Sequence, residues 1–432
     1  MTVAVFIFSL LAAMAIGMPI AYALLVCGLS LMAFLSATSG LVTFDSQILA
    51  QRFVDGADNF PLLAVPFFML AGEFMNAGGL SRRIVNLAMA WVGHLRGGLG
   101  YVTVLAAVVM ASLSGSAVAD TAALAALLIP MMRAAGYDIS RAAGLISSGG
   151  IIAPVIPPSI GLIIFGVAGN VSITKLFLAG IVPGLLMGLA VGLTWWWLAK
   201  KEDVLPAPKM TMPQRLKITA EGGLALALPV IIIGGMKFGV FTPTEAAVVA
   251  AVYSFCVGMF IYRELKWSRL YGLILTAGKT TAVVMFLVAA AMVSAWLITV
   301  ANIPTEVANM LSPFMDNKML LMLIMMVLIV VVGTALDFTP TVLILTPVLM
   351  PVVLKAGIDP VYFGIMFIMN NAIGLITPPV GTVLNVVCGV ARISMDDAFK
   401  GVLPFLLAQL GVLFLLVLFP QIVTVPLQWW MQ

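Results

Sequence analysis

The chain has 432 residues, of which 63% are hydrophobic and 9% charged, and its formal net charge is +4. Soluble domains carry roughly a quarter charged residues, so this composition excludes a soluble globular protein and predicts a polytopic membrane protein. The length allows about a dozen spans of roughly 20 residues each, embedded in a lipid bilayer. Nothing in the charge distribution suggests a nucleic-acid partner.

The first 100 residues predict three short spans and two helices at the membrane interface. The first charge is Asp45 and the first cation is Arg52, so the basic region of a signal peptide is missing and the apolar start is expected to remain as a membrane helix. We expect two spans within 3–36, separated at Gly17-Met18-Pro19, an interfacial helix at 44–59, a third span at 61–75 and a basic amphipathic helix at 80–94.

A serine-rich segment interrupts the apolar run 101–131 at its middle. It reads Ser112-Leu-Ser114-Gly115-Ser116-Ala-Val-Ala-Asp120-Thr121. A carboxylate at the centre of a plain span is costly unless it is paired or hydrated. The run therefore predicts a re-entrant hairpin with its tip at membrane depth.

The stretch 149–161, GGIIAPVIPPSIG, lies in an apolar segment that a continuous helix cannot follow. Pro157 and Pro158 lack an N–H, and their rings clash with the preceding turn. Broken backbone in a membrane is tolerated only where protein or a water-filled cavity satisfies the freed carbonyl groups. We therefore predict a discontinuous helix at 141–169 beside a polar site.

The rest of the chain repeats this order after a polar loop at 200–217. A second hairpin is expected at 319–351 and a second broken helix, around GLITPPVG, at 362–389. The remaining expected elements are spans at 176–197, 222–236, 244–262, 276–299 and 401–422, and a polar connection at 302–317.

The Gly, Pro and Asp residues of the two halves coincide when the chain is shifted by 221 residues. Pro157-Pro158 then falls on Pro378-Pro379, and Asp138 falls on Asp359. Such matches are hard to obtain by chance in an apolar sequence. We predict two repeats, at 1–199 and 221–432, joined by a cytoplasmic linker at 200–220.

The distribution of Lys and Arg predicts the orientation of the repeats. With the 200–217 loop inside, sixteen of the 21 cations lie inside, as the positive-inside rule requires. Both termini then face outward, and the odd number of crossings between the hairpins inverts one repeat relative to the other. The five cations outside are Arg52, Lys175, Lys237, Lys318 and Lys355.

Inverted repeats with two hairpins and two broken helices are the signature of a secondary transporter with its site at the bilayer midplane. Half-helix N-termini suit an anionic substrate, and freed carbonyl groups suit Na⁺. The fold class expected is an all-α polytopic membrane protein. A membrane-embedded enzyme and a passive channel are the weaker alternatives.

The first hairpin offers oxygen ligands for one Na⁺ site. Ser114 and Ser116 flank Gly115 and would face the backbone of the first broken helix, including Gly150 and Ala153. The alternative is that these small residues only permit close helix packing.

The second hairpin offers an equivalent site. Its expected Na⁺ ligands are Gly333, Thr334 and Asp337, facing Gly374, Ile376 and Thr377. Asp337 is the strongest indication, because a buried carboxylate requires a cation. It can also cap a half-helix N-terminus, and both roles are compatible.

The expected substrate and ion pathway combines the hairpin tips with the helix breaks. Asp120 is equally compatible with capping the second hairpin arm, and Asn371 and Asn385 with satisfying freed backbone. The candidates are Ser112, Ser114, Gly115, Ser116, Asp120, Pro154, Pro157, Pro158, Thr339, Pro340, Asn371, Pro378, Pro379 and Asn385.

Two motif-like features do not indicate an enzyme. Gly272–Thr280 has five residues between its glycines where a phosphate loop needs four, so ATP is not expected. His94 is the only histidine, which leaves no HExxH-type metal site and no Ser–His dyad. No organic cofactor and no catalytic residue are expected.

Both hairpin units resemble a known family. SLSGSAVADTAALAALLIPMMRAAGYDIS and GLITPPVGTVLNV, with FFMLAGEFMNAGGLSRRI, are similar to the large membrane (DctM-like permease) subunit of tripartite ATP-independent periplasmic (TRAP) transporters. The likeness runs the whole length and is strongest to the subgroup that handles the sugar acid 2,3-diketogulonate.

The resemblance implies a Na⁺-driven, elevator-type symporter in the bacterial inner membrane. Its organic-acid substrate would be a C4-dicarboxylate or a sugar acid such as a diketogulonate. Two partners are implied: a small four-helix membrane subunit, expected as a separate chain, and a periplasmic substrate-binding protein. The outer compartment, and with it both termini, would then be periplasmic.

Overall fold

The structure is a computed structural model, and it describes residues 2–38, 45–202 and 204–431. These residues form helices and turns, with no strand among them. Nine of the described helices are long and apolar enough to cross a membrane. The prediction of an all-α polytopic membrane protein is confirmed.

The N-terminal part is a run of short helices. Pro19 separates the first two, and Asp45 caps the third by accepting a hydrogen bond from the Gln47 N–H at 2.8 Å. The elements are α1 (Thr2–Ala15), α2 (Ile20–Thr38), α3 (Ser46–Ala57), η1 (Phe60–Leu63), α4 (Ala64–Ala77) and α5 (Leu80–Val92). The predicted interfacial helix at 44–59 is α3, and its residue 44 lies outside the described residues.

A hairpin and a broken helix follow, as predicted. The hairpin is formed by α6 (Gly98–Ser114) and α7 (Ala117–Ala134). The broken helix consists of α8 (Ile139–Gly150) and α9 (Ile160–Ala168), and the long helix α10 (Ile173–Leu198) completes this unit.

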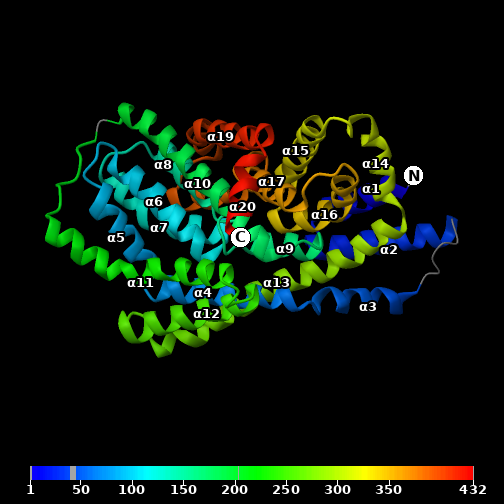
Figure 1. Ribbon diagram of the computed structural model, residues 1–432, viewed down its shortest axis with the longest axis horizontal. Helices are drawn as coiled ribbons and strands as arrows, with labels where there is room; N and C mark the ends of the chain where they lie inside the picture. The colour runs from blue at the N-terminus through cyan, green and yellow to red at the C-terminus, as the bar shows by residue number, and fades with distance from the viewer. Residues whose placement is uncertain (1, 39–44, 203, 432) are drawn as a thin grey trace.

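The middle of the chain contains the longest helix. α13 (Trp267–Val300) has 34 residues and is thus about 51 Å long, well beyond the roughly 30 Å hydrocarbon core. Figure 1 shows it running lengthwise beside α3 under the two hairpin units. The neighbouring elements are η2 (Ala199–Lys201), α11 (Met212–Lys237), α12 (Pro243–Cys256), the π-helix η3 (Val257–Ile261), α14 (Ile303–Leu311) and η4 (Ser312–Phe314).

The second unit repeats the first with matching boundaries. Its helices are α15 (Lys318–Ala335), α16 (Phe338–Lys355), α17 (Pro360–Gly374), α18 (Thr382–Ala391) and α19 (Met395–Leu418), followed by α20 (Gln421–Met431). Both ends of α16 lie 221 residues after those of α7, and both breaks contain a cis Pro–Pro bond. The inversion of one unit relative to the other remains a prediction.

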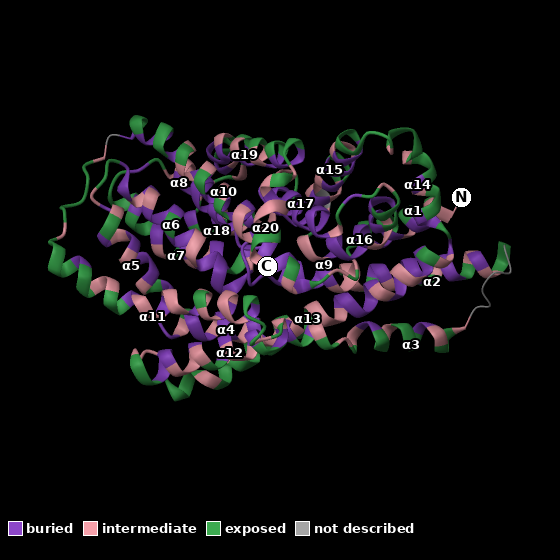
Figure 2. Ribbon diagram, in the orientation of Figure 1, coloured by how far each residue is buried: buried purple, intermediate pink, exposed green. Residues whose placement is uncertain are grey.

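The two units interlock along their broken helices. α8 packs against α19, and α9 packs against α16 and α17. Figure 2 shows these central helices largely buried, whereas α3, α11 and α12 carry many exposed residues. The breaks therefore lie inside the protein.

The structure corrects four expected segments. The span expected at 222–236 begins at Met212, where the Thr211 N–H donates to the Gln214 side chain, so the expected polar loop at 200–217 ends in helix α11. The connection at 302–317 contains α14, whose Pro304 in the first turn is compatible with a helix start. The span expected at 276–299 begins earlier, at Trp267. The last span ends at Leu418 because Phe419 precedes a proline, and α20 then forms a separate helix.

One close contact between the units gives a stability prediction. A Cβ added to Gly401 of α19 would lie 1.8 Å from the Ser140 carbonyl oxygen of α8. Gly401→Ala should destabilise the protein by about 1–3 kcal/mol, because the packed backbones must separate. Gly411→Ala on the same helix, with no atom within 4 Å, is the control. Unfolding temperatures measured in detergent would contradict the prediction if both variants melted alike.

Candidate functional site: two hairpin tips and two helix breaks

The first hairpin tip touches the first helix break. Gly115 connects α6 to α7 at a φ of +63°, and a Cβ there would lie 2.4 Å from the Pro158 carbonyl oxygen. Ser116 caps α7 by accepting from the Ala119 N–H at 3.4 Å. Gly115 therefore packs directly on the backbone of Pro158 and Ser159, and only glycine fits at this junction.

The break frees backbone carbonyl groups from helical hydrogen bonding. In a continuous helix the Ala153 and Pro154 carbonyl groups would accept from residues 157 and 158, but both are prolines. The Pro154 carbonyl accepts instead from the Ser159 hydroxyl at 2.5 Å. The carbonyl of the buried residue Ala153, a predicted Na⁺ ligand, accepts no backbone hydrogen bond from the described residues.

A cluster of buried oxygens lies beside this break. The Ser114 hydroxyl donates to one carboxylate oxygen of Asp120, which is 3% exposed, and the other oxygen has no partner among the described residues. Thr121 is fully buried with an unpartnered hydroxyl, and a Cβ on Gly150 would lie 1.6 Å from it. Buried polar groups are normally hydrogen-bonded, so this cluster has the donor set of a cation site.

Ser147 and Ser148, near the end of α8, carry two more buried hydroxyls that lack partners among the described residues. Sequence reasoning did not select them or Thr121. The available signal was that Ser147-Ser148 directly precedes the glycines of the break.

The second hairpin meets the second break in a different way. Gly333 packs on Gly374, since a Cβ on Gly374 would lie 3.0 Å from the Gly333 carbonyl oxygen. Asn371 is buried, donates to the Phe338 carbonyl at 2.8 Å and has an unpartnered side-chain oxygen 3.0 Å from the position of a Cβ on Gly333. In this unit the polar side chain, that of Asn371, belongs to the broken helix, and the small residue, Gly333, belongs to the hairpin.

One expectation about carboxylates was wrong, and the structure decides both capping alternatives. Asp337 is exposed, not buried, and caps α16 by accepting from the Phe338 N–H at 2.9 Å. It also accepts from the Thr382 hydroxyl at 3.4 Å. Asp120 does not cap α7, because Ser116 does so.

A cavity of about 170 Å³ lies between the two hairpin tips. The first turns of three helices line it: α7 at Ser116–Val118, α9 at Ile160–Gly161 and α16 at Asp337–Thr339. Met69 of α4 and Val284 of α13 close the sides. Helix N-termini favour anions, and Asp337 is the one charged side chain among the described residues that line the cavity.

A larger hollow of about 650 Å³ adjoins this cavity. It lies between α2, α13 and the tip of α16, and it shares Val284, Asp337 and Thr339 with the smaller cavity. Pro340 also lines it. Asp337 and Thr339 therefore lie at the junction between the small cavity and the larger hollow.

The predicted site residues fall into three groups. Gly115, Ser116, Pro154, Asp337 and Thr339 are brought together around the small cavity, and Pro340 lines the larger hollow. A second group lies at the helix breaks described above: Ser114, Asp120, Gly150 and Ala153 in the first unit, and Gly333, Asn371 and Gly374 in the second.

The remaining predicted residues serve the backbone or the packing at the breaks. Ser112 donates to the Val109 carbonyl, Thr334 to Val331, Thr377 to Ile373 and Asn385 to Val380. Pro157, Pro158 and Ile376 are buried, Pro378 is partly exposed and Pro379 is exposed.

Sequence reasoning missed the aromatic wall of the cavity. Phe338 lies so close to α9 that a Cβ on Gly161 would be 2.6 Å from its ring. The pattern Asp-Phe-Thr-Pro at a predicted hairpin tip was the available signal, but it does not show which element the ring would contact.

Comparison with known proteins identifies the family of this chain. The chain matches the family model of the tripartite ATP-independent periplasmic transporter, DctM component, over residues 7–422. The chain belongs to this family. It is therefore a large permease subunit of a TRAP transporter and not an enzyme.

Individual relatives cover almost the whole chain. The 2,3-diketo-L-gulonate TRAP transporter large permease protein YiaN of Escherichia coli is 58% identical over 99% of this chain and 100% of its own length. The C4-dicarboxylate TRAP transporter large permease protein DctM of Pseudomonas aeruginosa is 37% identical over 87% of this chain and 88% of its own.

A solved structure shares the fold. The crystal structure of the Alcanivorax borkumensis YdaH transporter, described as having an unusual topology, superimposes with a TM-score of 0.59. It covers 87% of this chain and 89% of its own, at 17% identity. At that identity the likeness concerns the fold alone.

Proposed function

We propose that this permease subunit couples the entry of a small organic acid to Na⁺, with the acid bound in the cavity between the hairpin tips. The observation that carries the proposal is the convergence of three helix N-termini on a cavity that no described cationic side chain lines. Backbone N–H groups and hydroxyls at such ends bind carboxylates through dipole and hydrogen bonds.

Na⁺ would occupy the oxygen-rich regions behind the cavity. The first site would use Ser114, Asp120, Thr121 and the Ala153 carbonyl, and the second Asp337, Asn371 and the backbone near Gly374. A cation at Asp337 would also offset repulsion between its carboxylate and the incoming acid, since unit charges 4 Å apart interact by about 4 kcal/mol at an effective dielectric constant of 20. This interaction couples the two binding events.

Ion pairs of Arg residues support the proposal that the residues assigned to the inside share one side of the membrane. Arg82 and Arg83 each pair with Glu264 at 2.7 Å, and Arg141 pairs with Glu202 at 2.6 Å. Each contact joins residues assigned to the inside. We propose a cytoplasmic 200–220 linker, periplasmic termini and location in the bacterial inner membrane.

The substrate we propose is a sugar acid of the diketogulonate type rather than a C4-dicarboxylate. The relative named for 2,3-diketo-L-gulonate is 58% identical, against 37% for the relative named for C4-dicarboxylates. A secreted binding protein would deliver the acid. The outer spans and the interfacial helices would form a stationary scaffold, supported by a small membrane subunit. The hairpins and broken helices would move together past that scaffold.

Uptake by proteoliposomes containing all three components tests the proposal. Labelled 2,3-diketo-L-gulonate should accumulate with an inward Na⁺ gradient and not with an equal K⁺ gradient, and succinate should compete weakly. Liposomes lacking the binding protein are the control. Uptake that is unchanged without a Na⁺ gradient would exclude the coupling, and stronger competition by succinate would exclude the substrate assignment.

A further inference from the structure

A membrane-facing groove runs between the first arm of the second hairpin and α19, away from the transport cavity. Two hollows form it, of about 300 Å³ and 380 Å³, and Val417 of α19 lines both. Val327 and Val331 of α15 are 63% and 60% exposed along its edge, and Phe414 of α19 is 50% exposed. Such apolar exposure at these helices places the groove against lipid.

The walls of the groove suit an acyl chain better than a protein helix. The described residues lining its deeper part are Leu, Val, Met and Phe, with Asn370 as the one polar member. The Asn370 amide nitrogen donates to the Met326 carbonyl at 2.6 Å. Helix–helix contacts in membranes are enriched in small residues that let backbones approach, and this lining contains none. Methionine side chains adapt to irregular apolar partners.

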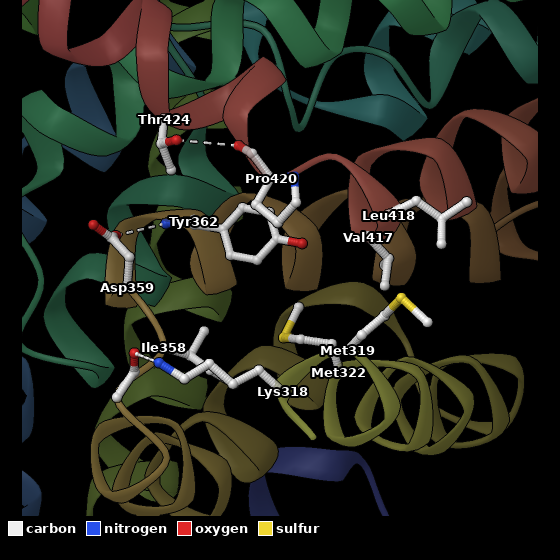
Figure 3. Close-up of a pocket in the computed structure, with 11 residues that line it drawn as sticks. Lys318, Met319, Met322, Ile358, Asp359, Tyr362, Val417, Leu418, Pro420 and Thr424 are labelled. Carbon is white, nitrogen blue, oxygen red and sulfur yellow. Dashed lines mark hydrogen bonds between the residues drawn. The ribbon is translucent and has the colours of Figure 1, made fainter. Parts of the chain in front are cut away.

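The shallow end of the groove carries one charge of each sign among mostly apolar residues. Figure 3 shows Lys318 and Asp359 on one side of this hollow, opposite Met319 and Val417. The Lys318 ammonium donates to the Gly357 carbonyl at 2.9 Å, which leaves two of its three hydrogens available. Asp359 caps α17 through the Val361 and Tyr362 N–H groups and is exposed.

We propose that this groove holds one phospholipid with a zwitterionic amine headgroup. Its acyl chain would lie along the deep apolar part, its phosphate beside Lys318 and its ammonium beside Asp359. An anionic headgroup such as phosphatidylglycerol would satisfy Lys318 but would offer no cation to Asp359. Charge complementarity therefore selects phosphatidylethanolamine. Because the lipid contacts α15 and α19 at once, it would stabilise the second hairpin against its unit.

Native mass spectrometry of the purified, delipidated full-length protein tests this proposal. The probe is an equimolar mixture of dioleoyl phosphatidylethanolamine and dioleoyl phosphatidylglycerol, which differ only in the headgroup. We expect one tightly held lipid, with phosphatidylethanolamine retained about fivefold over phosphatidylglycerol, a ratio typical of one exposed charge pair.

Two variants separate the deep groove from its mouth. Val330→Trp fills the apolar part of the groove and should remove lipid retention. Leu189→Trp, at an exposed position of α10 outside the groove, should leave lipid retention unchanged. Asp359→Asn keeps an oxygen to cap α17 and should abolish the preference between the two headgroups while lipid binding persists.

Three results would overturn the proposal: equal retention of both lipids by the unaltered protein, retention by Val330→Trp equal to that by Leu189→Trp, or an unchanged headgroup preference in Asp359→Asn. Cross-linking of Phe414→Cys to the small membrane subunit in the assembled transporter would likewise overturn it, because a protein would then cover the groove. Asp359→Asn keeps its cap, so the headgroup test remains decisive even if Val330→Trp fails to fold.

Discussion

Asp337→Asn is expected to lower the apparent Na⁺ affinity of uptake by about tenfold or more while the protein still folds. Asparagine retains the side-chain oxygen that accepts from the Phe338 N–H, so α16 keeps its cap. What is lost is a negative charge where the small cavity meets the larger hollow. Each factor of ten corresponds to about 1.4 kcal/mol, well within the interaction of a carboxylate with a nearby cation even after solvent screening. The Na⁺ dependence of initial uptake rates measures the effect.

Asp138→Asn is the matched control. Asp138 caps α8 by accepting from the Arg141 N–H at 2.9 Å, and it lies away from both cavities. If the two variants had the same Na⁺ dependence, Asp337 would be a helix cap without a role in ion binding.

The proline pairs could be located from sequence because their effect is local. Pro157-Pro158 and Pro378-Pro379 each remove two N–H groups in succession, and no tertiary contact restores a helix there. The structure breaks both helices at these positions. The helix starts at Asp138 and Asp359 are equally local, since each carboxylate caps the N–H groups that follow it.

The surroundings of the carboxylates could not be predicted in the same way. Asp337 and Asp120 both follow glycine-containing hairpin segments, yet one is exposed to a cavity and the other is 3% exposed. Their burial depends on which distant element packs over each tip. Phe338 illustrates the same limit, because its contact with Gly161 joins residues from opposite halves of the chain.

The sequence repeat does not predict which residues carry the polar side chains of each site. A shift of 221 places Gly150 on Asn371, so the break offers bare backbone in one half and an amide side chain in the other. Ser112 falls on Gly333, the small residue that packs against Gly374. The backbone plan is shared, but the buried side-chain oxygens of the proposed sites differ in origin. They come from the hairpin in the first unit and from Asn371 of the broken helix in the second, where the hairpin contributes the exposed Asp337.

The buried cluster of the first unit leads to the second large prediction. Asp120→Asn should raise the Na⁺ concentration for half-maximal uptake by about tenfold to a hundredfold, because it neutralises the one carboxylate among the described residues of that cluster. The protein should fold at least as well as before, since a buried charge without a counter-ion costs stability.

Thr121→Val tests whether the neighbouring hydroxyl is a ligand or only a packing group. Valine keeps the shape and removes an oxygen that has no partner among the described residues. A ligand role predicts a threefold to tenfold loss of Na⁺ affinity, about 1 kcal/mol. Thr346→Val is the matched control, because Thr346 of α16 is also fully buried, with a hydroxyl that lacks a partner among the described residues, but it packs against Gly169 rather than beside Gly150. Removing an unsatisfied hydroxyl should stabilise both variants alike, so a Na⁺ effect confined to Thr121 would identify the ion site. If both variants had the same Na⁺ dependence, Thr121 would be a packing residue and not an ion ligand.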